Sequence, residues 1–240
     1  MFLNPSMSAA LDRIAERAAD VRRAFTPGAM PQHSDVATAA PESQFTLDPL
    51  SASAPHDAYF ITSDARGRIA YSRNGTFHVA GGRLVDAQGL AVLGRRAQGG
   101  MLQELRIDPV DAALGRAADA RIDADGSFAY ARPAIDPRTG KRVVHDVVVG
   151  RVALARFPAG TKLETGDGSR FSAPEGVAPH TGLAGDGAFP PLVPLQRERS
   201  RVDIDESLLR LKDAYVAFDA LAAAETAKNR LGKTAMDIVK

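Results

Sequence analysis

The chain has 240 residues, and its 30 Lys or Arg against 29 Asp or Glu leave a formal net charge of +1. Hydrophobic residues make up 45% of it, which is enough for a core and excludes a wholly disordered chain, while the absence of Cys excludes disulfides, thiolate metal sites and a Cys nucleophile. Near-zero net charge and few aromatic residues argue against nucleic acid as a partner.

The first twenty residues have neither a basic region nor a long apolar run, so we expect no cleaved secretory signal peptide. No apolar stretch approaches the roughly 20 residues that a membrane span needs, so we expect no membrane insertion.

The N-terminal segment has the period of an amphipathic helix, with apolar residues spaced alternately by four and three positions. They are Met7, Leu11, Ile14, Ala18, Val21 and Phe25. Ser8 is the expected cap and Pro27-Gly28 the expected end of this helix. Residues 26–57 then predict an extended linker with a short strand near Phe45–Leu47.

From residue 58 the pattern changes to short β-runs separated by turn residues. Glycines recur every seven or eight positions, at Gly67, Gly75, Gly82 and Gly89. Asn74-Gly75 is a strong signal for a type I′ hairpin, because both central residues of that turn have positive φ. The spacing predicts an antiparallel meander that closes on itself or packs as a sandwich.

Residues 121–131, 142–157 and 169–173 continue the β character, whereas the Gly- and Pro-rich run 174–194 predicts irregular structure.

The last forty residues again have a helical period. The stripe consists of Ile204, Leu208, Leu211, Tyr215 and Phe218. Asp203 or Asp205 is the expected cap, and Gly232 marks a weak point or an end of the helix. The two terminal stripes suit either pairing with each other or contacts with other subunits.

Catalytic and ligand-binding motifs are missing from the sequence. It has no His-Glu-x-x-His, no phosphate-binding loop and no nucleophile elbow, and its five His have no ligand spacing. Residues 123–126 read Asp-Ala-Asp-Gly, but Arg121 and Arg132 stand where a calcium loop needs acids, so we expect a hairpin turn there. We therefore expect no enzyme activity, no cofactor and no metal site.

Residues 57–94 resemble the shared core of the bacterial flagellar rod and hook proteins. The matching residues are Tyr59, Phe60, Asp64, Gly67, Tyr71, Ser72, Arg73, Gly75, Phe77, Gly82, Leu84, Val85, Gly89 and Leu93. The motif's turns fall at Gly67, Arg73, Asn74, Gly75, Gly82 and Gly89. Residues 150–157, 163–171 and 198–203 resemble later family segments, whereas the two terminal helices depart from the family's motifs. Without a large insertion after the core, the chain is most similar to the proximal-rod type.

The resemblance implies a mainly β fold with helical termini. An antiparallel body at 58–190 would be flanked by segments 1–57 and 191–240, whose helices form a coiled-coil-like stalk and the two halves of a polymer core.

The implied function is that of a structural rod subunit, which polymerises through its terminal helices into the shaft that transmits torque from motor to hook. Its partners would be copies of itself, other rod and hook subunits and the flagellar export apparatus. It would reside in the periplasm-spanning rod of the basal body. The alternative is a non-polymerising accessory or cap protein that uses the rod fold as a binding module, which the altered terminal motifs favour.

Overall fold

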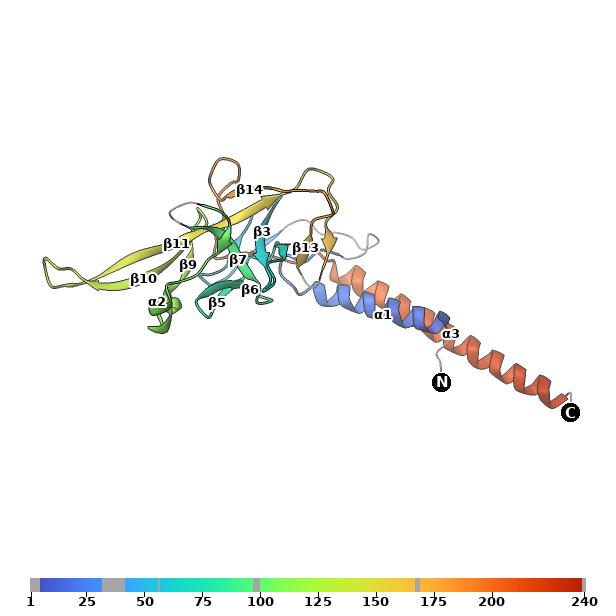
Figure 1. Ribbon diagram of the computed structural model, residues 1–240. Helices are drawn as coiled ribbons and strands as arrows, with labels where there is room; N and C mark the ends of the chain where they lie inside the picture. The colour runs from blue at the N-terminus through green and yellow to red at the C-terminus, as the bar shows by residue number, and fades with distance from the viewer. Residues whose placement is uncertain (1–4, 32–41, 56, 97–99, 167–168, 239–240) are drawn as a thin grey trace. The chain divides into compact units, whose positions relative to one another are not determined.

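The computed structural model describes residues 5–31, 42–55, 57–96, 100–166 and 169–238 (Figure 1). They form two compact units: residues 5–25, 31 and 202–238 in one, and residues 26–30 and 42–201 in the other. The first unit is helical and the second is mostly β, which confirms the predicted class of a β body with terminal helices. Part of the predicted linker, at 32–41 and 56, lies outside the described residues.

The helical unit consists of α1 (Pro5–Arg23) and α3 (Ile204–Ile238), which lie side by side (Figure 1). At about 1.5 Å per residue the two helices are roughly 28 Å and 52 Å long. Because α3 is so much longer, it continues well beyond the end of α1 (Figure 1).

The caps and ends predicted for these helices agree with the structure only in part. Asp203 is the cap of α3, because its Oδ1 accepts hydrogen bonds from the N–H groups of Asp205 at 2.9 Å and Glu206 at 3.1 Å. Ser8, in contrast, is not a cap: α1 begins at Pro5, whose fixed φ suits the first turn of a helix. The helix also does not end at Gly232, which lies inside α3.

The body contains short strands, two long strands and two short helical segments. The strands are β1 (Ser43–Phe45), β2 (Ala52–Ser53), β3 (Ala58–Ser63), β4 (Ile69–Ser72), β5 (Phe77–Ala80), β6 (Arg83–Asp86), β7 (Ala91–Arg96), β8 (Gln103–Glu104), β9 (Arg121–Ile122), β10 (Ser127–Ile135), β11 (Arg142–Arg156), β12 (Glu164–Thr165), β13 (Arg170–Ser172), β14 (His180–Leu183), β15 (Val193–Pro194) and β16 (Gln196–Glu198). The helical segments are α2 (Pro109–Ala113) and the 3-10 turn η1 (Arg116–Asp119).

Most of the strands join one sheet, in the order β12-β13-β4-β3-β11-β7-β6-β5. β11 is central: it pairs with β10 along a hairpin that projects from the body, and its second half pairs with β3, β7 and β14 (Figure 1). Two small sheets, β1-β16 and β15-β2, complete the body. The predicted irregular run 174–194 is therefore partly wrong, because β14 and β15 lie within it.

The predicted hairpin at Asn74-Gly75 is wrong. β4 pairs with β3 and β13, while β5 pairs with β6, so the chain crosses between two parts of the sheet at this point. Neither residue has positive φ. Gly75 is needed for another reason: its carbonyl accepts from the Ala52 N–H at 2.9 Å, and a Cβ on it would collide with the Ala52 carbonyl. The neighbouring hairpins β3–β4, β5–β6 and β6–β7 do form.

The core of the body lies under this sheet and collects aromatic and aliphatic side chains from strands distant in sequence. Phe60 and Phe77 pack edge to face with ring centroids 5.0 Å apart, and Phe128 and Leu154 are fully buried in the same cluster.

A buried carboxylate fixes α2 to this core. Asp111 accepts hydrogen bonds from the Tyr130 hydroxyl and from the Arg116 guanidinium, and Arg132 lies 3.5 Å away. The hydrogen bond from Tyr130, followed by the charge of Arg116, lowers the pKa of Asp111. Burial and the bond to Asp111 raise the pKa of Tyr130 to about 12.

The raised pKa of Tyr130 predicts a loss of stability at alkaline pH. An unfolded tyrosine ionises near pH ~10, so between that pH and about 12 the unfolded chain binds fewer protons than the folded one, and the free energy of unfolding falls as pH rises. Tyr130→Phe should reduce the slope of the unfolding free energy against pH, because it removes the one proton that this tyrosine contributes. Urea unfolding midpoints across that pH range measure it, and a pH dependence equal to wild type would contradict the assignment.

Candidate assembly site

A buried ion cluster lies within the body unit. The side chain of Arg73 is only 2% exposed, yet it carries a full charge. Its Nε donates to Glu198 Oε2 at 2.7 Å, its Nη2 also donates to that oxygen, and its Nη1 donates to the Ala58 carbonyl at 2.8 Å. The Nε of Arg201 donates to the other oxygen of Glu198 at 2.6 Å. The one buried carboxylate of Glu198 therefore pairs with two guanidinium groups, and these two arginines are more than a hundred residues apart in the chain.

Tyr59 completes the cluster. The Arg73 guanidinium carbon lies 5.4 Å from the centroid of the Tyr59 ring, within the range of a cation–π contact. Burial raises the pKa of the Tyr59 hydroxyl, so the ring stays neutral beside Arg73.

The same cluster joins the two segments through which the chain enters and leaves the body, and we call this contact the junction. The Gly28 N–H donates to the Glu198 carbonyl at 3.1 Å, and the Arg201 N–H donates to the Ala29 carbonyl at 2.9 Å. Gly28 has a φ of +66°, and a Cβ on it would lie 2.5 Å from the Arg73 carbonyl carbon. Only glycine fits between these two backbones. Residues 26–30, which follow α1, and the residues up to Arg201, which precede α3, therefore both belong to the body unit.

The structure divides the predicted seam of α3 into two groups. Ile204, Leu211 and Phe218 are half-buried, whereas Leu208 and Tyr215 are exposed. The most deeply buried residues of α3 are the small Ser207 and Ala214. Ile204, Leu211 and Phe218 alternate with these two residues at spacings of three and four positions, so the small and the half-buried large residues share one face of α3.

The predicted seam of α1 divides in the same way. Ile14, Ala18 and Val21 are half-buried, while Leu11 and Phe25 are exposed. The most buried side chains of α1 are Asp20 and Arg23, a pair 3.5 Å apart. The predicted role of the whole seam in assembly stays a prediction.

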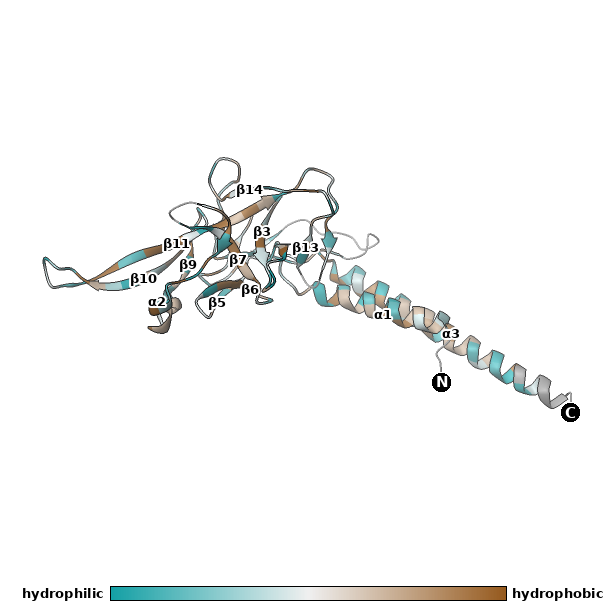
Figure 2. Cartoon of the chain, viewed as in Figure 1, coloured by the Kyte–Doolittle hydropathy of each residue, from teal (hydrophilic) through white to brown (hydrophobic). Residues whose placement is uncertain are grey.

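A second face of α3 also carries exposed apolar side chains. Leu209 and Val216 lie two turns apart on one face and are each more than half exposed. Together with Leu208 and Tyr215 they leave α3 with several exposed apolar side chains. Figure 2 shows apolar and polar residues alternating along this helix. No described helix is long and apolar enough to cross a membrane.

The predicted turn residues of the body fall into two groups. Gly67, Gly82 and Gly89 have positive φ and stand at hairpin turns. Arg73, Asn74 and Gly75 are buried at the crossing between β4 and β5. Arg73 is the member of the predicted set that the structure places in the ion cluster.

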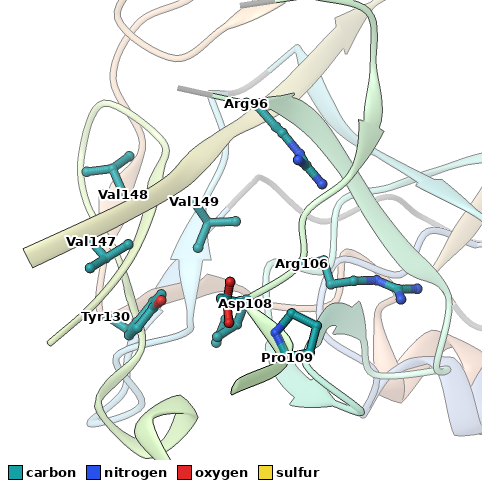
Figure 3. Close-up of a pocket in the computed structure, with 9 residues that line it drawn as sticks. Arg96, Arg106, Asp108, Pro109, Tyr130, Val147, Val148 and Val149 are labelled. Atoms are coloured by element: carbon teal, nitrogen blue, oxygen red, sulfur yellow. The ribbon is translucent and has the colours of Figure 1, made fainter. Parts of the chain in front are cut away.

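The body also has a cleft of about 410 Å³ between α2 and the base of the long hairpin (Figure 3). Arg96 and Arg106 line one side of it and the valines of β11 the other, with Asp108 between them (Figure 3). Asp108 is occupied as the cap of α2, accepting from the Val110 N–H at 2.9 Å. The lining has no pair of nucleophile and base, and the described residues include no group of three or more acidic, His or Cys side chains that could hold a metal.

Sequence reasoning missed two parts of the ion cluster, Glu198 and Arg201, as site residues. Both lie in the segment that resembles a family motif, which was the available signal. The pairing of Glu198 with Arg73 joins residues 125 positions apart, and a single sequence does not show such a contact.

The described residues form a β body with a buried ion cluster and two terminal helices. Residues 56–130 match the model of the flagellar hook protein FlgE/F/G D1 domain. This match bears out the predicted resemblance to the flagellar rod and hook protein family over that part of the chain. It spans β3 to β9 and the start of β10, including Arg73. No curated protein matched the chain.

Gly28 provides a test of the junction. Gly28→Ala adds a Cβ against the Arg73 backbone, whereas Gly67→Ala, at a φ of +77°, meets nothing within 4 Å. Gly67→Ala should cost about 1–2 kcal/mol for its left-handed backbone alone, and Gly28→Ala should cost more. Urea unfolding measures both. Equal losses would mean that the Gly28 contact with Arg73 is not tight.

The buried carboxylate can be tested against a matched exposed one. Glu198→Gln leaves two guanidinium groups in the body without a counter-charge, and we expect it to lower the free energy of unfolding by about 3–5 kcal/mol. Glu42→Gln breaks the exposed pair with Arg199, which is 2.9 Å long, and should cost below about 1 kcal/mol. Similar losses in the two variants would contradict a central role for Glu198.

Proposed function

We propose that this chain is a structural subunit of the flagellar basal-body rod, of the proximal-rod type, and that it polymerises through its terminal helices. The observation that carries the proposal is the D1 domain match within a chain whose two helices form a unit of their own. In this proposal the β body surrounds a helical inner wall, and the assembled shaft transmits torque from motor to hook.

The exposed apolar side chains of α3 support polymerisation. Leu208, Leu209, Tyr215 and Val216 project from a helix that already uses another face for α1. Burial of such groups against neighbouring helices would gain about 25 cal/mol for each Å² removed from water. Repetition of this contact in one direction produces an open helical filament.

The junction supports the transmission of torque. Two segments held against a close-packed body by a buried ion cluster resist displacement, because separating them would expose unpaired charges. The proposal also includes export through the flagellar secretion apparatus, which suits a chain without Cys, and a location in the periplasm-spanning rod.

A double variant on the exposed face of α3 tests polymerisation. Leu209→Asp with Val216→Asp should leave the monomer folded, because both side chains are exposed, but it should abolish incorporation into basal bodies and motility. Lys212→Asp is the matched control, since it changes the charge of the same helix by the same two units without removing an apolar group. Far-ultraviolet circular dichroism checks folding.

Motility and incorporation at wild-type levels in the double variant would contradict polymerisation through α3. A loss of both in the Lys212→Asp control would show that charge, rather than the apolar face, is responsible.

A further inference from the structure

Asn74-Gly75 is a chemically reactive pair that the proposed function does not use. Of the three asparagines in the chain, Asn4, Asn74 and Asn229, only Asn74 is followed by glycine. Because glycine has no Cβ, its backbone nitrogen is the least hindered in reaching the side chain of the residue before it. The pair therefore allows the Gly75 nitrogen to attack the side-chain carbonyl carbon of Asn74.

This reaction is intramolecular and needs only water. The Gly75 nitrogen forms a bond to Cγ of Asn74, the bond from Cγ to the side-chain nitrogen breaks, and the proton of the Gly75 N–H leaves with the ammonia that is released. A five-membered succinimide ring remains, which water opens at either carbonyl. One opening gives aspartate at residue 74. The other gives isoaspartate, in which the main chain is longer by one methylene.

In the folded chain the Asn74 side of this pair is buried and fixed. Asn74 is only 2% exposed. Its backbone N–H donates to the Ser72 hydroxyl at 3.0 Å, and its Oδ1 accepts from the Thr76 N–H at 3.0 Å. Ring closure requires both the side chain and the backbone between residues 74 and 75 to rotate. These buried hydrogen bonds oppose that rotation.

The Gly75 side is held as firmly. Its carbonyl accepts from the Ala52 N–H at 2.9 Å. A Cβ built on Gly75 would collide with the Ala52 carbonyl oxygen and lie 3.0 Å from the Phe60 ring, so this residue has no free space beside it. Two residues earlier, Arg73 is held by Glu198 in the ion cluster. The reactive peptide bond therefore lies between two anchored residues.

The same anchors conflict with the isoaspartyl product, whose extra methylene lies between Arg73 and Gly75. The added length would either move the Arg73 guanidinium away from Glu198 or press Gly75 further against Ala52. The first leaves buried charges without partners, which strongly destabilises a fold. The second has no room.

We propose that Asn74 is a self-modification site that is open in the unfolded chain and closed by folding, and that isoaspartate at this position prevents the chain from folding. A chain that folds promptly keeps its asparagine, whereas a chain that stays unfolded loses the ability to form the ion cluster. The inference goes beyond the proposed function and does not depend on it.

The rate of ammonia loss at different urea concentrations tests the first part. The wild-type chain is incubated at mildly alkaline pH, which favours loss of the proton from the attacking nitrogen. Residue 74 is then followed by mass spectrometry of residues 74–83, which trypsin releases as one peptide. The rate should follow the fraction of unfolded chain and be lower by about a thousandfold without urea. Equal rates in the folded and the unfolded chain would overturn the proposal.

Refolding tests the second part. Chains kept unfolded for increasing times are returned to buffer without urea, and the folded fraction is isolated by size-exclusion chromatography. Chromatography of the peptide 74–83 distinguishes isoaspartate from aspartate. Isoaspartate at residue 74 should be depleted in the folded fraction and concentrated in the fraction that does not refold. The same proportion of isoaspartate in both fractions would overturn the proposal.

Asn74→Ser is the matched control. Serine has no side-chain amide to lose, and its hydroxyl can still accept from the Thr76 N–H. The variant keeps the Asp-Gly pairs of the chain, so isomerisation at those pairs affects both proteins equally. After long incubation in urea the wild type should recover a smaller folded fraction than the variant. Equal losses would overturn the proposal, and if the variant folds poorly from the start, the fractionation of the wild type decides alone.

Discussion

The architecture of the body depends on one buried carboxylate, that of Glu198, and on the two guanidinium groups that it neutralises. Arg73 comes from the crossing between β4 and β5, and Glu198 and Arg201 come from the segment that precedes α3. Each charge would be costly to bury alone, so the three residues are stable only together. This requirement, rather than apolar packing, determines which chain segments meet at this point.

The junction explains features that otherwise look unrelated. Gly28 fits against the Arg73 backbone because it has no Cβ, and Gly75 comes equally close to Ala52 two residues further along. At Gly28 and Gly75 the fold therefore uses glycine for close approach of two backbones rather than for a hairpin turn.

Much of the fold was predictable because local patterns dictate it. Heptad spacing predicted α1 and α3, and glycine positions predicted the hairpins at Gly67, Gly82 and Gly89. The hairpin at Asn74-Gly75 was wrong, because tertiary pairing of β4 with β13 and of β5 with β6 overrides the local turn preference. The buried face of α3 was predicted only in part. Ile204, Leu211 and Phe218 are half-buried as expected, but the most buried residues of the helix are the small Ser207 and Ala214, which the predicted stripe omits. The ion cluster was out of reach because its partners are distant in sequence.

Imaging of basal bodies tests the central claim, that this chain is a building unit of the rod. Basal bodies purified from cells with and without the chain would be compared by electron cryomicroscopy. We expect the rod to be absent or truncated without the chain, and a tubular layer whose subunits fit the β body to be present with it. A rod of unchanged length and density in cells that lack the chain would contradict the account.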